Sequence, residues 1–207
     1  MSSRLDNTHQ GERFNFKGMK MKKMILLVCA LLVSWNAGAM DIAGVHLADR
    51  VQVGDVSLRL NGAGIRTKLI FKVYVGALYL PQKQTSAEAI IDDVNESRIV
   101  LHMLRELSSS KLYAAFREAI EANHSPDVLA AINVQMKQME QIFDAIKEVN
   151  PGDVITLDYQ PASGTRISVN GTERGAVAGA GFNRALLRIW LGSNPVQEDM
   201  KKGMLGG

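Results

Sequence analysis

The longest apolar stretch after residue 40 covers residues 69–80, and it predicts a central β-strand. Only Lys72 within it is charged, and Val, Phe and Tyr are frequent, as in a strand that is buried on both faces. Shorter stretches rich in β-forming residues predict its neighbours at residues 98–107, 154–160, 164–169 and 172–176. Asn170-Gly171 is typical of a tight hairpin turn, so we expect a largely antiparallel sheet.

A different period, with apolar residues every three or four positions, predicts helices between these strands. One helix begins after Ser108 and buries Leu112, Phe116 and Ile120. The next helix carries a longer apolar stripe, formed by Leu129, Ile132, Met136, Met139, Phe143 and Ile146. Two further helices are expected at residues 87–92 and 178–191. We expect the stripe to pack on the sheet. An alternative is that its methionines form a pliable wall for an apolar ligand.

The order of these elements predicts one α+β domain, an antiparallel sheet with a layer of helices packed on one face. Residues 1–39 are not expected to belong to it. Lysines within residues 20–23 precede an apolar run at 24–35, and Ala37-Gly38-Ala39 fits a cleavage site. The sequence thus predicts a secretory signal at 1–39, a mature domain at 40–207 and a periplasmic location. An uncleaved anchor is the alternative, although a spanning helix needs roughly 20 apolar residues.

The charge balance argues against a nucleic-acid-binding domain. Removing six basic and two acidic residues with the signal, from totals of 24 and 21, leaves a net charge of about −1. The only cysteine, Cys29, would leave with the signal, so the mature domain is expected to fold without disulfides.

Several kinds of catalytic or cofactor site lack support in the sequence. The four histidines are scattered and no cysteine stays in the mature chain, so no metal site is expected. Ser108, Ser109 and Ser110 are interpreted as helix capping rather than as a nucleophile. The glycines at 175, 179 and 181 do not follow the dinucleotide-binding order. We predict no cofactor.

Arg66 is the strongest candidate for a binding residue. It follows Gly62 and Gly64, which predict a turn, and it precedes the apolar strand at 69–80. Glycines permit close backbone approach, so the guanidinium can lie beside a packed sheet, where it suits a carboxylate or another oxyanion. An exposed arginine on an ordinary glycine turn is the alternative.

Three segments resemble the chalcone isomerase superfamily. They are Asn-Gly-Ala-Gly-Ile-Arg at 61–66, Phe-Lys-Val-Tyr-Val-Gly-Ala-Leu-Tyr-Leu at 71–80, and Ala-Leu-Leu-Arg-Ile-Trp-Leu-Gly at 185–192 with Pro195-Val196 and Met200-Lys201 after it. The resemblance extends over most of the chain after residue 40. It implies an open-faced sandwich of sheet and helices, closed by C-terminal helices.

The resemblance also implies roles for single residues. In the plant enzymes of this family, an arginine organises an oxyanion-forming cyclisation, assisted by a threonine, a tyrosine, an asparagine and a late hydroxyl. Arg66 matches the arginine and Tyr113 the tyrosine. Tyr74 stands in place of the threonine, Ile189 in place of the late hydroxyl and Ile120 in place of the asparagine. Since most of the catalytic polar set is absent, no catalytic residue is expected.

The non-catalytic branch of the superfamily, the fatty-acid-binding proteins, fits these departures better. In that branch, the arginine and the tyrosine of a Lys-Val-Tyr strand hold a carboxylate. The same three residues occur here at 72–74. The predicted ligand-binding residues are Arg66, Tyr74, Tyr113, Arg105 and Ile189. Arg105 is expected to face inward from its strand, with a surface ion pair as the alternative. A straight strand would separate Arg66 from Tyr74 by about 26 Å, so we expect a bend, at Thr67-Lys68.

Three functions follow as hypotheses. The first is non-catalytic binding of a fatty acid or similar apolar anion between sheet and helices, with no nucleic-acid partner and no stable membrane span after signal cleavage. The second is an intramolecular lyase or isomerase in which Arg66 stabilises developing negative charge. The third is an envelope structural or interaction protein, in which Met136, Met139 and Phe143 fill the space beside Arg66.

Overall fold

The computed structural model describes residues 40–207, and the predicted signal at 1–39 lies outside them. A long hairpin, β4 (Val56–Lys68) and β5 (Phe71–Leu80), contains the two longest strands of the sheet and is called the central hairpin below. The prediction of a glycine turn was wrong, because Gly62 and Gly64 lie inside β4. The chain instead reverses at Leu69-Ile70, just after the predicted bend.

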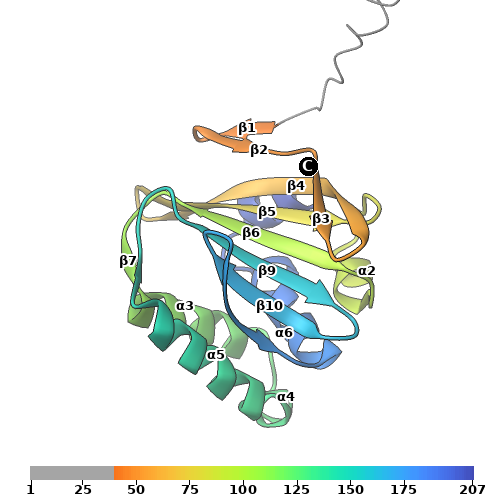
Figure 1. The fold of residues 1–207 in the computed structure, drawn as a ribbon, viewed down its shortest axis with the longest axis vertical. Coiled ribbons are helices and arrows are strands. Elements are labelled where there is room, and N and C mark those ends of the chain that lie inside the picture. Colours follow the sequence, from red (N-terminus) through yellow and green to blue (C-terminus); the bar gives the residue numbers. More distant parts are fainter. Residues whose placement is uncertain (1–39) are drawn as a thin grey trace, which may run out of the picture. The chain divides into compact units, whose positions relative to one another are not determined.

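The main sheet has seven antiparallel strands in the order β11-β10-β9-β6-β5-β4-β3 (Figure 1). Besides the central hairpin, its strands are β3 (Arg50–Val53), β6 (Ser97–Met103), β9 (Val154–Gln160), β10 (Gly164–Val169) and β11 (Thr172–Val177). Two small two-stranded sheets accompany it, β1 (Met40–Ile42) with β2 (Val45–Leu47), and β7 (Leu107–Ser108) with β8 (Glu148–Val149). Asn170 and Gly171 both have positive φ, as the predicted hairpin turn requires.

One predicted strand is shorter than expected. The stretch at 98–107 ends as β6 at Met103, and Leu104 and Arg105 form a bend before β7. Leu104 still donates its backbone N–H to Val73, but Leu107 pairs with Val149 of β8. Arg105 is therefore not on the strand.

Six helices lie among the described residues: α2 (Ala87–Asp92), α3 (Ser109–Glu121), α4 (Pro126–Ala131), α5 (Asn133–Ile146), α6 (Ala180–Leu191) and α7 (Glu198–Met204). Ser108 caps α3 through its hydroxyl, as expected. The single helix predicted for the stripe was wrong, because Ile132, at φ −103° and ψ 11°, separates α4 from α5. The predicted apolar stripe therefore begins in α4 and continues along α5.

Two apolar cores lie on opposite faces of the sheet. Every second residue of β5 faces the helices, so Tyr74, Leu78 and Leu80 join the larger core with residues of α3, α5 and α6. The alternate residues, Val75, Ala77 and Tyr79, join a smaller core that Leu47 of β2 helps to cover. Figure 1 shows the helices on one side of the sheet and the β1–β2 hairpin on the other. The predicted α+β fold is confirmed, and the apolar stripe packs in the larger core as expected.

Candidate functional site

Arg66 and Tyr74 lie directly opposite each other across the central hairpin. They are register partners in β4 and β5, and Tyr74 is in turn the partner of Met103 in β6. Side chains of directly opposed residues project from the same face, with Cβ atoms roughly 5 Å apart. Tyr74 and Met103 belong to the helix-side core. The hairpin therefore brings together the two residues that were expected to share a carboxylate.

The glycines before Arg66 position a helix over it. Gly62 and Gly64 project from the same face of β4 as Arg66, and α7 packs against them. A Cβ at Gly64 would lie 2.6 Å from the Cα of Met200, and a Cβ at Gly62 would overlap the carbonyl oxygen of Gly203. Only glycine permits this approach, so the expected close contact is present although the expected turn is not.

Because α7 lies so close to β4, Gln197 at its N-terminal end reaches Arg66. The Gln197 Oε1 accepts hydrogen bonds from the backbone N–H of Thr67, at 2.8 Å, and from Nη1 of Arg66, at 3.4 Å. Nη1 also donates to the Thr67 carbonyl, at 2.9 Å. These bonds fix one end of the half-buried guanidinium and leave Nε and Nη2 without a protein acceptor in residues 40–207.

Arg66 also lacks a carboxylate partner in the described part of the chain. The five ion pairs found there involve other residues. A partly desolvated guanidinium attracts an anion more strongly than one in bulk water, because the surrounding dielectric is lower. The position of Arg66 therefore favours binding of a carboxylate or another oxyanion.

Tyr74 adds a neutral hydrogen-bond donor beside this charge. Its side chain is 9% exposed, and its hydroxyl accepts a hydrogen bond of 3.1 Å from Nε1 of Trp190 in α6. Burial raises the pKa of Tyr74, while the Trp190 hydrogen bond and the positive charge of Arg66 act in the opposite direction. The phenol is thus protonated at neutral pH. Within residues 40–207 its hydroxyl makes only the Trp190 bond, so its own hydrogen can be donated to a ligand.

Tyr113 lies in the helical layer, between α3 and α5. Its ring packs against Phe116 and Phe143, with centroids 6.1 and 5.6 Å away, and its hydroxyl donates to the Met136 carbonyl at 3.5 Å. Burial raises the pKa of Tyr113, and the negative charge of Glu140 adds to this effect. These contacts tie Tyr113 to the helices and do not join it to the Arg66–Tyr74 pair.

Arg105 does not have the predicted inward orientation. It is exposed, and its guanidinium carbon lies 4.2 Å from the centre of the Phe71 ring, at the end of the hairpin. The bend after Met103 carries it off the strand. The surface ion pair proposed as the alternative is also not found, because a cation–π contact takes its place.

Ile189 is buried in the helix-side core, next in sequence to Trp190. The sequence interpretation missed Trp190 and Gln197 as site residues. Trp190 could have been found from its N–H, since a tryptophan on the buried face of a helix needs an acceptor. Gln197 gave no such signal, because it meets Arg66 only through a contact between residues 131 positions apart.

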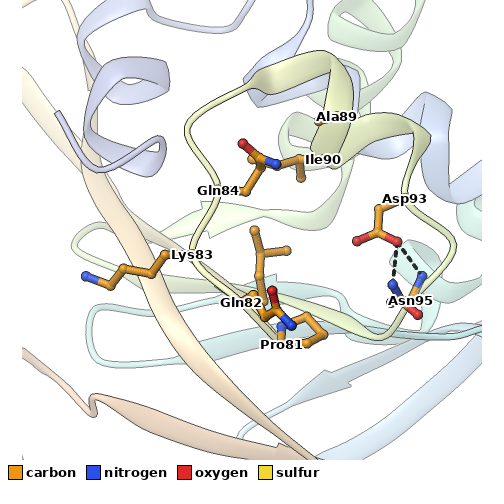
Figure 2. A pocket seen from close by; sticks show the side chains of 9 residues that line it. Pro81, Gln82, Lys83, Gln84, Ala89, Ile90, Asp93 and Asn95 are labelled. Carbon is orange, nitrogen blue, oxygen red and sulfur yellow. Dashed lines mark hydrogen bonds between the residues drawn. The ribbon is translucent and has the colours of Figure 1, made fainter.

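Tyr74 packs among buried side chains of the helix-side core. This core includes four buried methionines, Met103, Met139, Met200 and Met204. A cavity of about 240 Å³ opens instead at the other end of β5, beside α2, where Gln82, Lys83 and Asp93 line it (Figure 2). A second, of about 260 Å³, lies between α5 and β11. Neither cavity is lined by Arg66 or Tyr74.

Residues 40–207 contain no group of three or more His, Cys, Asp or Glu side chains placed to hold a metal ion. In that same part of the chain, no helix has the length and apolar character needed to cross a membrane.

Comparison with known proteins agrees with this architecture. A family model described as chalcone isomerase-like matches residues 39–206. No curated protein matches the chain. The crystal structure of the Arabidopsis thaliana fatty-acid binding protein AtFAP1 superposes with a TM-score of 0.61 at 16% identity, over 81% of this chain and 95% of that one. At this identity the likeness shows a shared fold.

Proposed function

The chain belongs to the chalcone isomerase-like family, and we propose that it binds a fatty acid or a similar apolar anion without catalysing a reaction. One observation carries the proposal. Arg66, without a carboxylate partner in residues 40–207, lies opposite the buried, protonated hydroxyl of Tyr74. Together they offer a positive charge and a neutral donor to one carboxylate, through charge-assisted hydrogen bonds.

The hydrocarbon tail of the ligand needs an apolar path away from this pair. Gly76 lies two residues beyond Tyr74 on the same face of β5, and the methyl end of Met200 occupies the space above it. Met200 is flexible and unbranched, so its side chain can turn aside for an acyl chain. We propose that the tail replaces Met200 over Gly76, where each buried methylene contributes about 0.8 kcal/mol.

The likeness to AtFAP1, a fatty-acid binding protein by name, supports a binding rather than a catalytic role for the shared fold. The residues of this chain point the same way. Ile189 and Ile120, which stand where the plant enzymes carry polar groups, are both buried and apolar.

A binding titration tests the proposal. The purified protein is delipidated and titrated with a long-chain fatty acid, with a fluorescent acyl probe as competitor. Arg66→Met is expected to weaken binding about ten- to hundredfold, because hydrogen bonds to charged groups contribute about 1.5–3 kcal/mol. Arg59→Met, an exposed arginine on the same strand, is the matched control. Equal affinities of the Arg66 and Arg59 variants would contradict the proposal.

The packing of the core favours a second candidate, an envelope structural or interaction protein. Tyr74 is buried among packed side chains, and neither of the two cavities described above is lined by it. In this case no fatty acid would raise the melting temperature of the delipidated protein. A ligand that binds the folded state at a hundred times its Kd stabilises it by about 2.7 kcal/mol, so thermal unfolding separates the two candidates.

A third candidate is an intramolecular lyase or isomerase. The guanidinium of Arg66 beside a phenol donor is an arrangement that can stabilise an enolate or phenolate oxyanion. Turnover of a panel of chalcones would support this candidate, provided that Arg66→Met abolishes it.

The export of the chain is a further part of the proposal, and it rests on the sequence alone. Cleavage after Ala39 would release a domain that begins at Met40. Cell fractionation and N-terminal sequencing of the recovered protein test this directly. Recovery of the uncleaved chain from the cytoplasmic fraction would contradict it.

A further inference from the structure

The tip of the central hairpin exposes three consecutive apolar side chains. Leu69 is 88% exposed, Ile70 85% and Phe71 47%. Of the other exposed large apolar residues in the described chain, Val134 is the most exposed, at 66%, and it stands alone on α5. In Figure 1 the tip lies at the left end of β4 and β5, on the side of β7. A contiguous apolar surface of this kind marks an interaction site more often than a scattered residue does.

The backbone of the turn at the tip is conformationally strained. Leu69 has φ +57°, a left-handed conformation that glycine or asparagine adopts with less strain. A leucine in this place, so exposed, gains almost no burial in the described structure to offset the strain. Such a strained, solvent-exposed apolar residue indicates a contact made outside the chain.

Positive charges surround the tip. Lys68 precedes it, Lys72 follows it, and Arg105 stacks on the Phe71 ring at 4.2 Å. Among the residues directly adjacent in sequence to Lys68, Lys72 and Arg105, Glu106 is the only acid. The long aliphatic stems of lysine and arginine can lie along an apolar layer while their charged ends stay at its polar boundary.

We propose that this tip, residues 68–72 with Arg105, docks on a lipid surface that carries anionic headgroups. Leu69 and Ile70 would enter the boundary between headgroups and acyl chains, and the three cations would meet the phosphates. A protein partner fits less well. Stable protein interfaces bury about 800 Å² on each side, far more than three side chains at a hairpin end can offer.

This inference does not rest on fatty-acid binding, but the two sites are close along the chain. Arg66 lies two residues before Lys68 on β4, and Tyr74 two residues after Lys72 on β5. Docking would therefore bring the Arg66–Tyr74 pair near the headgroups of the bilayer.

A local fluorescence measurement tests the docking in the full chain. Cys29, the only cysteine, is replaced by Ser, and Ile70→Cys is labelled with an environment-sensitive nitrobenzoxadiazole dye. Vesicles of equal parts phosphatidylcholine and phosphatidylglycerol should shift the emission to the blue. The same dye at Val134→Cys is the control, and its emission should not change. Because each dye reports only its own surroundings, membrane binding by another segment does not imitate the result.

The charges are tested separately. Lys68→Gln, Lys72→Gln and Arg105→Gln should each lower the affinity for anionic vesicles about fivefold. Lys83→Gln, an exposed lysine at the opposite end of β5, should have no effect. Raising the salt from 0.01 to 0.1 M shortens the screening length from about 30 to about 10 Å, and should weaken binding of the unmodified tip.

Three results would overturn the proposal. The first is unchanged emission at Ile70 with anionic vesicles. The second is an equal shift with vesicles of phosphatidylcholine alone. The third is a concentration-dependent shift without vesicles, which would show that the tip contacts a second copy of the chain. The Arg66→Met variant should dock normally, so loss of fatty-acid binding and loss of docking are distinguishable.

Discussion

The hydroxyl of Tyr74 in β5 accepts a hydrogen bond of 3.1 Å from the indole N–H of Trp190 in α6. The two residues are 116 positions apart, and both are buried in the helix-side core. This bond joins the sheet to the helical layer at the place where Arg66 meets Tyr74.

Tyr74→Phe should destabilise the protein by about 1–3 kcal/mol, because it leaves the buried Trp190 N–H without an acceptor. Trp190→Phe also loses packing and should cost more. In the double variant neither partner is left unsatisfied, so the two costs should fall short of additivity by about 1 kcal/mol. Urea unfolding of the four proteins measures this coupling. Strict additivity would mean that the bond contributes nothing.

The raised pKa of Tyr74 predicts a loss of stability in alkali. The folded state holds the phenol proton more tightly than the unfolded state, whose tyrosine pKa is about 10. The stabilisation is therefore complete below pH 10 and is lost as the pH rises through the folded-state pKa. Tyr74→Phe lacks this proton, so its unfolding free energy should fall less steeply above pH 10 than that of the wild type. Parallel curves from pH 8 to pH 11 would contradict the prediction.

The close approach of α7 to β4 predicts a strong asymmetry between two glycines. Gly64→Ala should destabilise the protein by more than about 2 kcal/mol, because its Cβ would meet backbone atoms of Met200. Gly181→Ala is the control, since an added Cβ meets nothing within 4 Å on the exposed side of α6. It should stabilise the helix by up to about 1 kcal/mol. Thermal unfolding of both variants checks the difference in sign.

The proposed tail site predicts opposite effects on binding from two core variants. Met200→Ala should cost about 2–5 kcal/mol in stability, because it leaves a cavity above Gly76, yet it should bind an acyl chain more tightly. Gly76→Ala should weaken acyl binding, since its Cβ takes up the same space. Calorimetric titration of the delipidated variants measures both. If Met200→Ala binds no more tightly than the wild type, the tail does not lie over Gly76.

Leu69→Asn should stabilise the hairpin turn, because asparagine tolerates the positive φ of this position better than leucine does. The gain should be about 1 kcal/mol, the lower end of the cost of a left-handed conformation. The same change should weaken docking on anionic vesicles, because it removes the apolar side chain from the tip. Stability rising while vesicle affinity falls would separate the two roles of the residue. An unchanged vesicle affinity would indicate that Leu69 has no function outside the turn.

The fold was predictable to the extent that local periods define it. The expected strands at 154–160 and 164–169 have the observed bounds of β9 and β10, and the expected helix at 87–92 has the bounds of α2. Alternation and a three-to-four repeat are properties of neighbouring residues, and they survive in any packing. The period also predicted a helix at 178–191, which is α6, and the family resemblance added the closing helix that follows it, α7.

Errors arose where a local signal has two physical uses. Gly62 and Gly64 predicted a turn, but here glycine makes room for α7, and the hairpin turns instead at Leu69, an unfavourable turn residue. Arg105 follows a β-rich stretch, yet the pairing of Leu107 with Val149 draws the chain off the sheet before it. In both cases a partner distant in sequence decided between the two uses.

By itself, then, the sequence determined the α+β class, most helices and strands, and Arg66 and Tyr74 as a candidate pair. Only the tertiary structure decided that these two residues are register partners, that Gln197 and Trp190 hold them, and that Tyr113, Arg105 and Ile189 lie in other surroundings. The physical reason is the range of the interactions. Periodicity is encoded over a few residues, whereas the contacts of this site join positions 116 and 131 apart and exist only once the sheet and helices have packed.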